Sequence, residues 1–187
     1  MKKIIIAVLA CTMVSLISCD KIKDATSIDF KVKGVKFDFS GVVSELAPLQ
    51  VPELRAGATQ TFAVTRTVNI SEIGDSDAIS YANKISKVVV NSSLVKVTFV
   101  PAGSYTIENL VITADGVAGS PLSVPTISTG GTFTFTSAMN NFTAAFVTKL
   151  LSTKTITVTV RGETDAPVGT TINISYESDL LLTASLL

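Results

Sequence analysis

The feature that most constrains the fold of this chain is an alternation of apolar and polar residues with a period of two. Alternation of this kind places one face of a β-strand on a core and the other face in water. The polar partners are largely threonine and serine, which suit a pleated surface. The alternating rows are Val35-Phe37-Phe39, Phe62-Val64 and Val68-Ile70 with Arg66 between them, Val95-Val97-Phe99, Phe133-Phe135, Ile156-Val158-Val160, Ile172-Ile174-Tyr176 and Leu180-Leu182-Ala184-Leu186.

Residues typical of turns separate these rows. They are Pro101-Ala102-Gly103, Asp115-Gly116, Gly130-Gly131 and the segment 165–169. About eight to ten short strands at this spacing predict an all-β fold, a two-sheet antiparallel β-sandwich. Two connectivities remain open: an immunoglobulin-like Greek key, which we prefer at this stage, and a jelly roll. The chain lacks the tryptophan that marks antibody-type domains.

Three departures from the alternation predict local features. The rows Tyr105–Ile107 and Leu110–Ile112 are offset by one residue, which predicts a β-bulge near Glu108 and Asn109. Helical spacing instead predicts one or two short crossover helices that cover an open end of the sandwich. The longer helix is expected over Ser137–Leu151, capped by Ser137 and burying Met139, Phe142, Ala145, Phe146 and Leu150 as core. The shorter is expected over Asp75–Ile85, with Ile79, Ala82 and Ile85 on one face.

The first residues have the three parts of a secretory signal: a basic start, an apolar run from Ile4 to Ile17 and a small-residue cleavage site. The run is shorter than the roughly 20 residues that a transmembrane helix needs. Its end, Leu16-Ile17-Ser18-Cys19, resembles the lipobox of bacterial lipoproteins. That resemblance implies cleavage after Ser18 and a diacylglyceryl group on the sulfur of Cys19. An ordinary signal peptide with a cysteine at its end is the alternative.

The expected organisation is therefore a lipoprotein signal peptide over 1–18, a lipidated cysteine and tether over 19–27, and a single domain over 28–187. Asp20 resembles the inner-membrane retention signal of enteric lipoproteins, whereas Bacteroidetes lipoproteins with charges here reach the outer membrane or the cell surface. The chain is similar in style to small Bacteroidetes envelope lipoproteins with an immunoglobulin-like domain. We expect a cell-envelope location, at the outer membrane rather than the inner membrane.

Composition excludes several kinds of chemistry. The chain has no histidine, and of its two cysteines Cys11 lies in the leader and Cys19 is the expected lipid attachment point. This excludes a Ser-His-Asp triad, a Cys-His dyad and His- or Cys-based metal sites, so no cofactor is expected. Removing Lys2 and Lys3 leaves about two more acidic than basic residues, so nucleic acid is not an expected partner.

Carboxylates remain as candidate ligands. Glu72, Asp75 and Asp77 fall within six residues and are weak candidates for calcium. The alternative is that Asp75 caps a helix and Asp77 lies at the positive end of that helix. Glu163 and Asp165 are a second pair of possible calcium ligands, but their simpler interpretation is that they are solvated residues of a turn.

The preferred functional hypothesis is a non-catalytic envelope module that binds a protein or glycan, or serves as an accessory part of a larger assembly. Its expected contact surface is the loops around residues 101–104, 115–131 and 163–169, since sandwiches carry recognition in their end loops. One alternative is an assembly subunit that pairs strands with a neighbour, with the apolar run Leu180–Leu187 as a candidate donor strand, although this run is more simply the last strand of the sheet. The other is a hydrolase that uses carboxylates alone.

Overall fold

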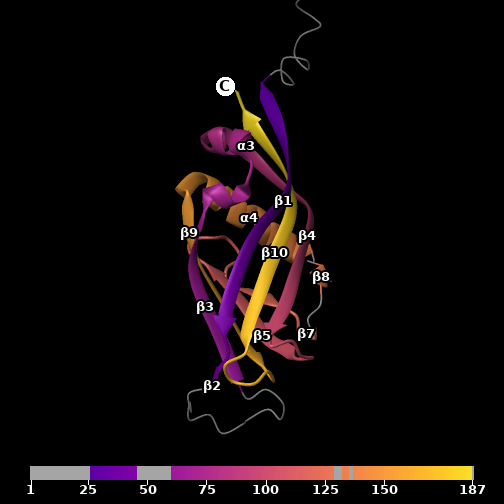
Figure 1. The fold of residues 1–187 in the computed structure, drawn as a ribbon. Helices are drawn as coiled ribbons and strands as arrows, with labels where there is room; N and C mark the ends of the chain where they lie inside the picture. The colour runs from indigo at the N-terminus through magenta and orange to yellow at the C-terminus, as the bar shows by residue number, and fades with distance from the viewer. Residues whose placement is uncertain (1–25, 46–59, 129–131, 135–136, 187) are drawn as a thin grey trace, which may run out of the picture.

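Two antiparallel sheets form the core of the structure, a computed structural model that describes residues 26–45, 60–128, 132–134 and 137–186 (Figure 1). Sheet A has the order β1 (Ser27–Val42), β10 (Thr171–Ser185), β4 (Ile85–Val100) and β8 (Thr132–Thr134). Sheet B has the order β2 (Ser44–Glu45), β3 (Gln60–Asn69), β9 (Thr155–Thr164), β5 (Thr106–Ala114) and β6 (Leu122–Val124), and β7 (Ile127–Ser128) also pairs with β5. The predicted two-sheet antiparallel sandwich is confirmed.

The strand pairing identifies the connectivity. If β2 and β3 are counted as one strand, and β6 and β7 as another, the chain has eight principal strands. They pair from the outside of the sequence inward: the first with the last (β1 with β10), then β3 with β9, β4 with β8, and β5 with β6. This is a long antiparallel hairpin rolled into two sheets, which is a jelly roll. The immunoglobulin-like Greek key is therefore wrong for this chain. The alternation is common to both connectivities because it records which face is buried and not which strands are neighbours.

The alternating rows face one another across the sandwich. Sheet A contributes Val35, Phe37, Phe39, Val95, Val97, Phe99, Ile172 and Ile174, and sheet B contributes Phe62, Val68, Ile107, Leu110, Ile156, Val158 and Val160, all of them buried. Arg66 interrupts the row on β3, and its guanidinium lies over the ring of Phe39, 4.7 Å from the centroid. The interruption is therefore an inward arginine that packs on an aromatic ring.

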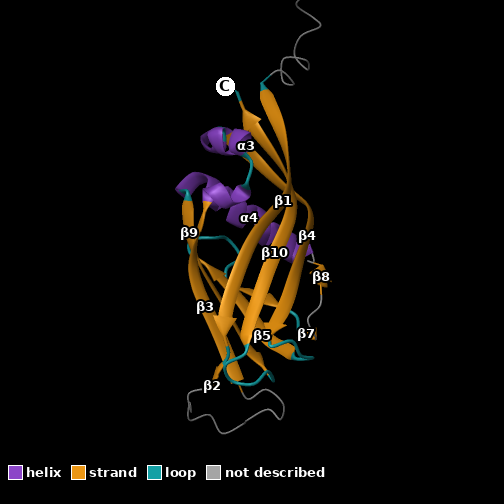
Figure 2. Ribbon diagram, viewed as in Figure 1, coloured by secondary structure: helices purple, strands orange, loops and turns teal. Residues whose placement is uncertain are grey.

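Helices cover the part of sheet A that extends past sheet B (Figure 2). The segment between β3 and β4 forms η1 (Ile70–Ile73), α3 (Ser76–Ser80) and η2 (Ala82–Lys84), so the helix predicted over 75–85 is broken into two short pieces. Asp75 caps α3, as predicted, by accepting a hydrogen bond from Ala78 N at 2.8 Å. The longer prediction is confirmed as α4 (Ser137–Thr153), which buries Met139, Phe142, Phe146 and Leu150. The side chain of Ser137 lies outside the described residues.

Sheet A thus has two regions. In the two-sheet region, residues 35–42, 92–100 and 171–178 pack on sheet B. In the helix-covered region, residues 27–32, 85–90 and 180–185 continue the same three strands, and η1 and α3 pack on β1 while η2 packs on β10.

A carboxylate on the central strand marks the boundary between these regions. The register shifts between Val32 and Val35 on β1, and beside Asp179 in the pairing of β10 with β4. Asp179 accepts hydrogen bonds through Oδ1 from Gly34 N at 3.0 Å and through Oδ2 from Ser92 Oγ at 3.1 Å. Gly34 adopts φ +65°, a conformation that side chains disfavour. One side chain therefore holds an irregularity on each neighbouring strand.

The bulge predicted near Glu108 and Asn109 is confirmed. The register of β5 against β9 shifts between Glu108 and Val111, and Asn109 has a left-handed φ of 49°. Asparagine tolerates this conformation better than most residues. The bulge lets the apolar rows on both sides of it face the same core.

The two ends of the described chain meet in the helix-covered region. Leu186 N donates a hydrogen bond to Thr26 O at 2.7 Å, and Ser27 pairs with Ser185. Within the described residues, no helix is long and apolar enough to cross a bilayer.

Candidate functional site

The outer face of sheet A is hollowed into a groove in the two-sheet region. We call it the outer groove. Its volume is about 410 Å³, and its polar lining consists of Lys36, Asp38, Ser40, Lys96, Thr98, Asn173, Ser175 and Glu177. These are the polar members of the alternating rows. Because successive side chains of a strand point to opposite faces, the alternation that buries Phe37 and Val97 on the inner face places these polar residues on the outer face.

The register arranges these side chains in cross-strand rows, with β10 in the middle. One row is Asp38, Ser175 and Lys96, and the next is Ser40, Asn173 and Thr98. Lys36 stands opposite Glu177 and lies 3.3 Å from Asp38 in an exposed ion pair. Ser40 Oγ donates to Asn173 Oδ1 at 2.8 Å.

The outer groove therefore offers hydrogen bonding without a dominant charge. Two lysines balance two carboxylates, and three hydroxyl side chains and an amide complete the polar lining. Ser175 Oγ is covered by its neighbours and has no hydrogen-bond partner within the described chain. The volume of the outer groove, about 410 Å³, falls within the range of about 300–1,000 Å³ that is usual for small-ligand sites.

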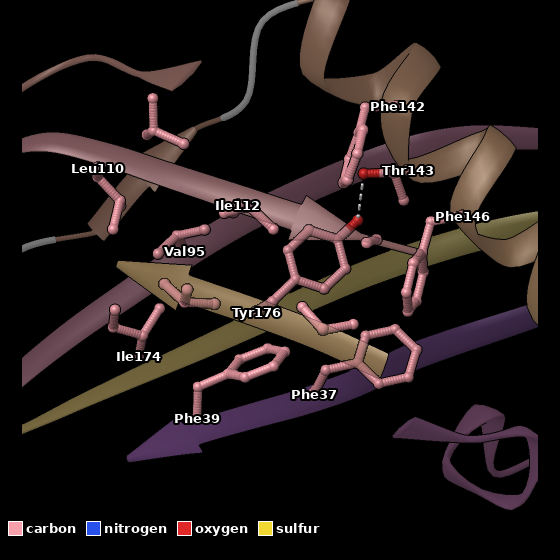
Figure 3. Close-up of a pocket in the computed structure, with 14 residues that line it drawn as sticks. Phe37, Phe39, Val95, Leu110, Ile112, Phe142, Thr143, Phe146, Ile174 and Tyr176 are labelled. Carbon is pink, nitrogen blue, oxygen red and sulfur yellow. Dashed lines mark hydrogen bonds between the residues drawn. The ribbon is translucent and has the colours of Figure 1, made fainter. Parts of the chain in front are cut away.

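A second hollow lies inside the sandwich, beneath α4 (Figure 3). Its volume is about 50 Å³, and its lining is apolar except for Thr143 and Tyr176. Apolar cavities that bind a molecule such as benzene measure about 150 Å³. This hollow is a space left in the core between large aromatic side chains, and it supplies no acid, base or nucleophile placed for catalysis.

Tyr176 is the polar group of that hollow. Its hydroxyl donates to Thr143 Oγ1 at 3.0 Å (Figure 3). Thr143 Oγ1 in turn donates to Met139 O at 3.0 Å. The ring of Tyr176 stacks on Phe37, with 5.9 Å between centroids. Burial raises the pKa of Tyr176 above its usual value, although hydrogen bonds with serine and threonine side chains oppose the shift. The phenol stays neutral and structural.

The three calcium candidates do not converge on one point. Glu72 forms a bidentate pair with Arg66, at 3.2 and 2.7 Å, and also accepts from Asn69 N at 2.9 Å. Asp75 caps α3, and Asp77 lies in its first turn. No group of three or more acidic, histidine or cysteine side chains in the described part of the chain is placed to hold a metal ion. The helix-cap interpretation of Asp75 and Asp77 accounts for both residues.

Glu163 and Asp165 have separate partners. Glu163 Oε2 accepts from Asn109 Nδ2 at 2.9 Å, which supports the bulge on β5. Asp165 Oδ1 accepts from Thr106 N at 2.7 Å and ties the loop after β9 to the start of β5.

The loops expected to form one contact surface lie at two ends of the sandwich. The loops 101–105 and 165–170 are together, as the bond between Asp165 and Thr106 shows. Residues 115–121 follow the other end of β5, where Asp115 N donates to Thr157 O near the start of β9. The prediction of a single contact surface is therefore wrong, because the loops before and after β5 are separated by the length of that strand. Residues 127–128 return to the first end, and 129–131 lie outside the described residues, with Gly130-Gly131 among them.

The run proposed as a donor strand is the middle of sheet A. Leu180, Leu182 and Ala184 are at most 1% exposed, and β10 pairs with β1 on one side and β4 on the other. A strand paired along both edges has no free backbone groups to offer a neighbour. The donor assignment of 180–187 is wrong for this fold. Ser18 and Cys19 lie outside the described residues.

No protein-family model matches the sequence, and no curated protein sequence matches it. Among solved structures, one of Desmodium yellow mottle tymovirus has 10% identity and a TM-score of 0.32, covering 82% of this chain and 89% of that chain. One of a marine algae virus of the order Picornavirales has 10% identity and a TM-score of 0.28, covering 93% and 80%. Similarities this weak carry no argument, so the jelly roll rests on the strand order alone.

Proposed function

We propose that this chain is a lipid-anchored envelope protein that acts as a non-catalytic binding module, and that the outer groove binds a neutral oligosaccharide. The observation that carries the proposal is the polar rows across β1, β10 and β4, which line a groove of about 410 Å³.

The chemistry of the groove favours a glycan over a peptide. Backbone groups in the middle of a sheet are already paired, so recognition on its face depends on side chains. Extended peptides are usually recognised at a sheet edge, where backbone groups are free. Side chains with balanced charges, hydroxyls and an amide suit a ligand that carries many hydroxyl groups and no net charge.

The position of the outer groove supports its proposed role as a binding site on an anchored protein. The described chain begins at Thr26, in the helix-covered region, whereas the outer groove lies in the two-sheet region. If Cys19 is lipidated, the tether joins the domain at the end remote from the groove, which then faces away from the membrane. The eight residues from Asp20 to Ser27 span at most about 28 Å when extended.

The lipid anchor has its own test, which does not depend on any ligand. Cells of the native host are grown with an alkyne-labelled fatty acid, and the protein is isolated from membranes. We expect label on the wild-type protein and none on Cys19→Ser. An unlabelled wild-type protein, or an intact leader by mass spectrometry, would contradict the anchor and leave the groove to be judged separately.

The groove is tested with an array of neutral oligosaccharides, followed by calorimetric titration of any that bind. Asn173→Ala leaves ligand groups without a partner, which costs about 1–3 kcal/mol and so weakens binding roughly tenfold or more. Thr157→Ala is the matched control, because Thr157 is exposed on the outer face of sheet B. Equal affinity in Asn173→Ala and wild type, or no oligosaccharide binding at all, would overturn the proposal.

A further inference from the structure

One edge of sheet A is unpaired along half a strand. Strand β8 pairs with β4 only at Leu94–Lys96, so on that side residues 85–91 have no partner strand in the described chain (Figure 1). We call residues 85–91 the free edge. In a strand, the backbone groups of alternate residues point toward such an edge, ready to pair with an added strand.

A groove runs beside the free edge, between β4 and α4. Its volume is about 250 Å³, and it is lined by Ala82, Asn83, Ile85, Ser86, Lys87, Val88, Thr148, Leu151 and Ser152. Val88 pairs with Leu182, which is fully buried, so Val88 faces the same side as the core. Val88 is itself only half-buried, because no strand lies beyond it. An added strand would direct every second side chain into this edge groove.

The lining of the edge groove carries positive charge, from Lys87, and no negative charge. No acidic residue occurs in the segments 78–107 and 116–162, which contain every residue that lines the edge groove. Lys84 and Lys87 are exposed, and Lys154 Nζ donates to Asn83 Oδ1 at 3.1 Å at the rim. Acidic residues lie beyond the lining at each end of the free edge: Asp77 in α3, which packs on η2, and Asp179, which accepts a hydrogen bond from Ser92.

The opposite edge of the sheet carries more lysines. Strand β1 carries Lys31, Lys33 and Lys36 and a bulge at Gly34, which are features that protect an edge against pairing. The free edge is itself irregular at Ser86 and Asn91, where the register against β10 shifts, but its regular stretch 87–90 carries only one lysine, Lys87.

We propose that the free edge binds an acidic, extended peptide segment of a partner protein as an added antiparallel or parallel strand. Backbone pairing with the regular stretch 87–90 supplies the affinity, small apolar side chains enter the edge groove beside Leu151, and acidic side chains face Lys84 and Lys87. This inference is independent of the glycan proposal, because the outer groove and the free edge share no residue.

The test uses the full-length chain, expressed with its leader and purified from membranes in detergent. The probe is a fluorescent octapeptide in which glutamate alternates with valine, measured by anisotropy. A second peptide of the same sequence carries N-methyl groups at alternate residues, which remove backbone donors and keep the charge. Hydrogen–deuterium exchange locates the contact.

We expect the peptide to bind, to slow exchange over residues 85–91, and to lose most of its affinity on N-methylation. Lys84→Glu with Lys87→Glu should weaken binding by about tenfold or more, since charge reversal adds repulsion of roughly 1.4 kcal/mol or more. Lys31→Glu with Lys33→Glu, on the opposite edge, should leave affinity unchanged. Equal binding of the methylated peptide, equal effects of both charge reversals, or occupation of the free edge by a second copy of the chain would each overturn the proposal.

Discussion

The two regions of sheet A share three strands but bury them differently. In the two-sheet region, an alternating row on each strand meets a matching row of sheet B. In the helix-covered region, the same strands meet short helices, which contribute residues such as Ile73, Ala78 and Ala82. The face of the strands that is buried does not change, since Leu180 and Leu182 continue the row of Ile172 and Ile174.

The difference teaches that a strand can keep one buried face while its covering layer changes from sheet to helix. The change needs irregularities on the neighbouring strands, and here they are gathered around Asp179. Because β10 is continuous through both regions, we expect them to unfold together. The following changes test that expectation.

The largest effect is expected from Phe37→Ala in the two-sheet region. The ring of Phe37 is 2% exposed, stacks on Tyr176 and meets Phe146 edge-on at 5.4 Å between centroids. Truncating a buried phenylalanine costs about 3–5 kcal/mol of unfolding free energy. Denaturant titration followed by circular dichroism measures the loss. A loss below about 1 kcal/mol would mean that the aromatic cluster relaxes around the gap.

Leu182→Ala is the matching change in the helix-covered region, where Leu182 is fully buried on β10. We expect a loss of about 2–5 kcal/mol. Hydrogen exchange should show faster global opening of both regions, because the strand runs through both. Faster exchange confined to residues 27–32, 85–90 and 180–185 would show instead that the helix-covered region opens independently.

Asp179→Ala, at the boundary, should cost less. It removes two hydrogen bonds to a carboxylate that is only partly buried, so we expect a loss of about 1–2 kcal/mol. Asp38→Ala is the control, because its ion pair with Lys36 is exposed and should contribute well below about 1 kcal/mol. Equal effects of the two substitutions would show that Asp179 does not hold the strand irregularities in place.

The smallest effect near neutral pH is expected from Tyr176→Phe, which removes the hydroxyl and its hydrogen bond to Thr143, worth about 0.5–1.5 kcal/mol. Burial raises the pKa of Tyr176, so the folded state keeps its proton at a pH where the unfolded chain loses it. Stability is therefore fully present below the usual tyrosine pKa of about 10 and falls as the pH rises above it. Tyr176→Phe should lose less stability than wild type between neutral and strongly alkaline pH. Parallel profiles would contradict the shift.

The sequence predicts well where the strands and helices lie along the chain, but it predicts poorly which strands pair with one another. Alternation identifies the buried face of each main strand, and the offset at Glu108 and Asn109 identifies the bulge, because both are local signals. The choice between an immunoglobulin-like and a jelly-roll connectivity depends on β10 lying between β1 and β4, which no local pattern records. The same limit explains why the loops before and after β5 were assigned to one surface.

The outer groove was missed for a related reason. Its residues are the polar members of rows that were already recognised, and Asp38, Ser175 and Lys96 become a unit only when their strands are neighbours. The closeness of Glu72, Asp75 and Asp77 in the sequence instead favours a metal site. In the structure, Glu72 pairs with Arg66, and Asp75 and Asp77 lie at the start of α3. The sequence signal that indicates such a groove is a row of alternating polar residues on each of three long strands.

The bond between Leu186 and Thr26 has a practical consequence. Any reporter protein or affinity tag appended to the carboxyl end would emerge next to the start of β1, on the same side as the proposed tether. If Cys19 is lipidated as proposed, such a fusion would lie next to the bilayer, where its epitope is less accessible. An insertion into the exposed turn at 101–104 would instead display the tag at the opposite tip of the molecule.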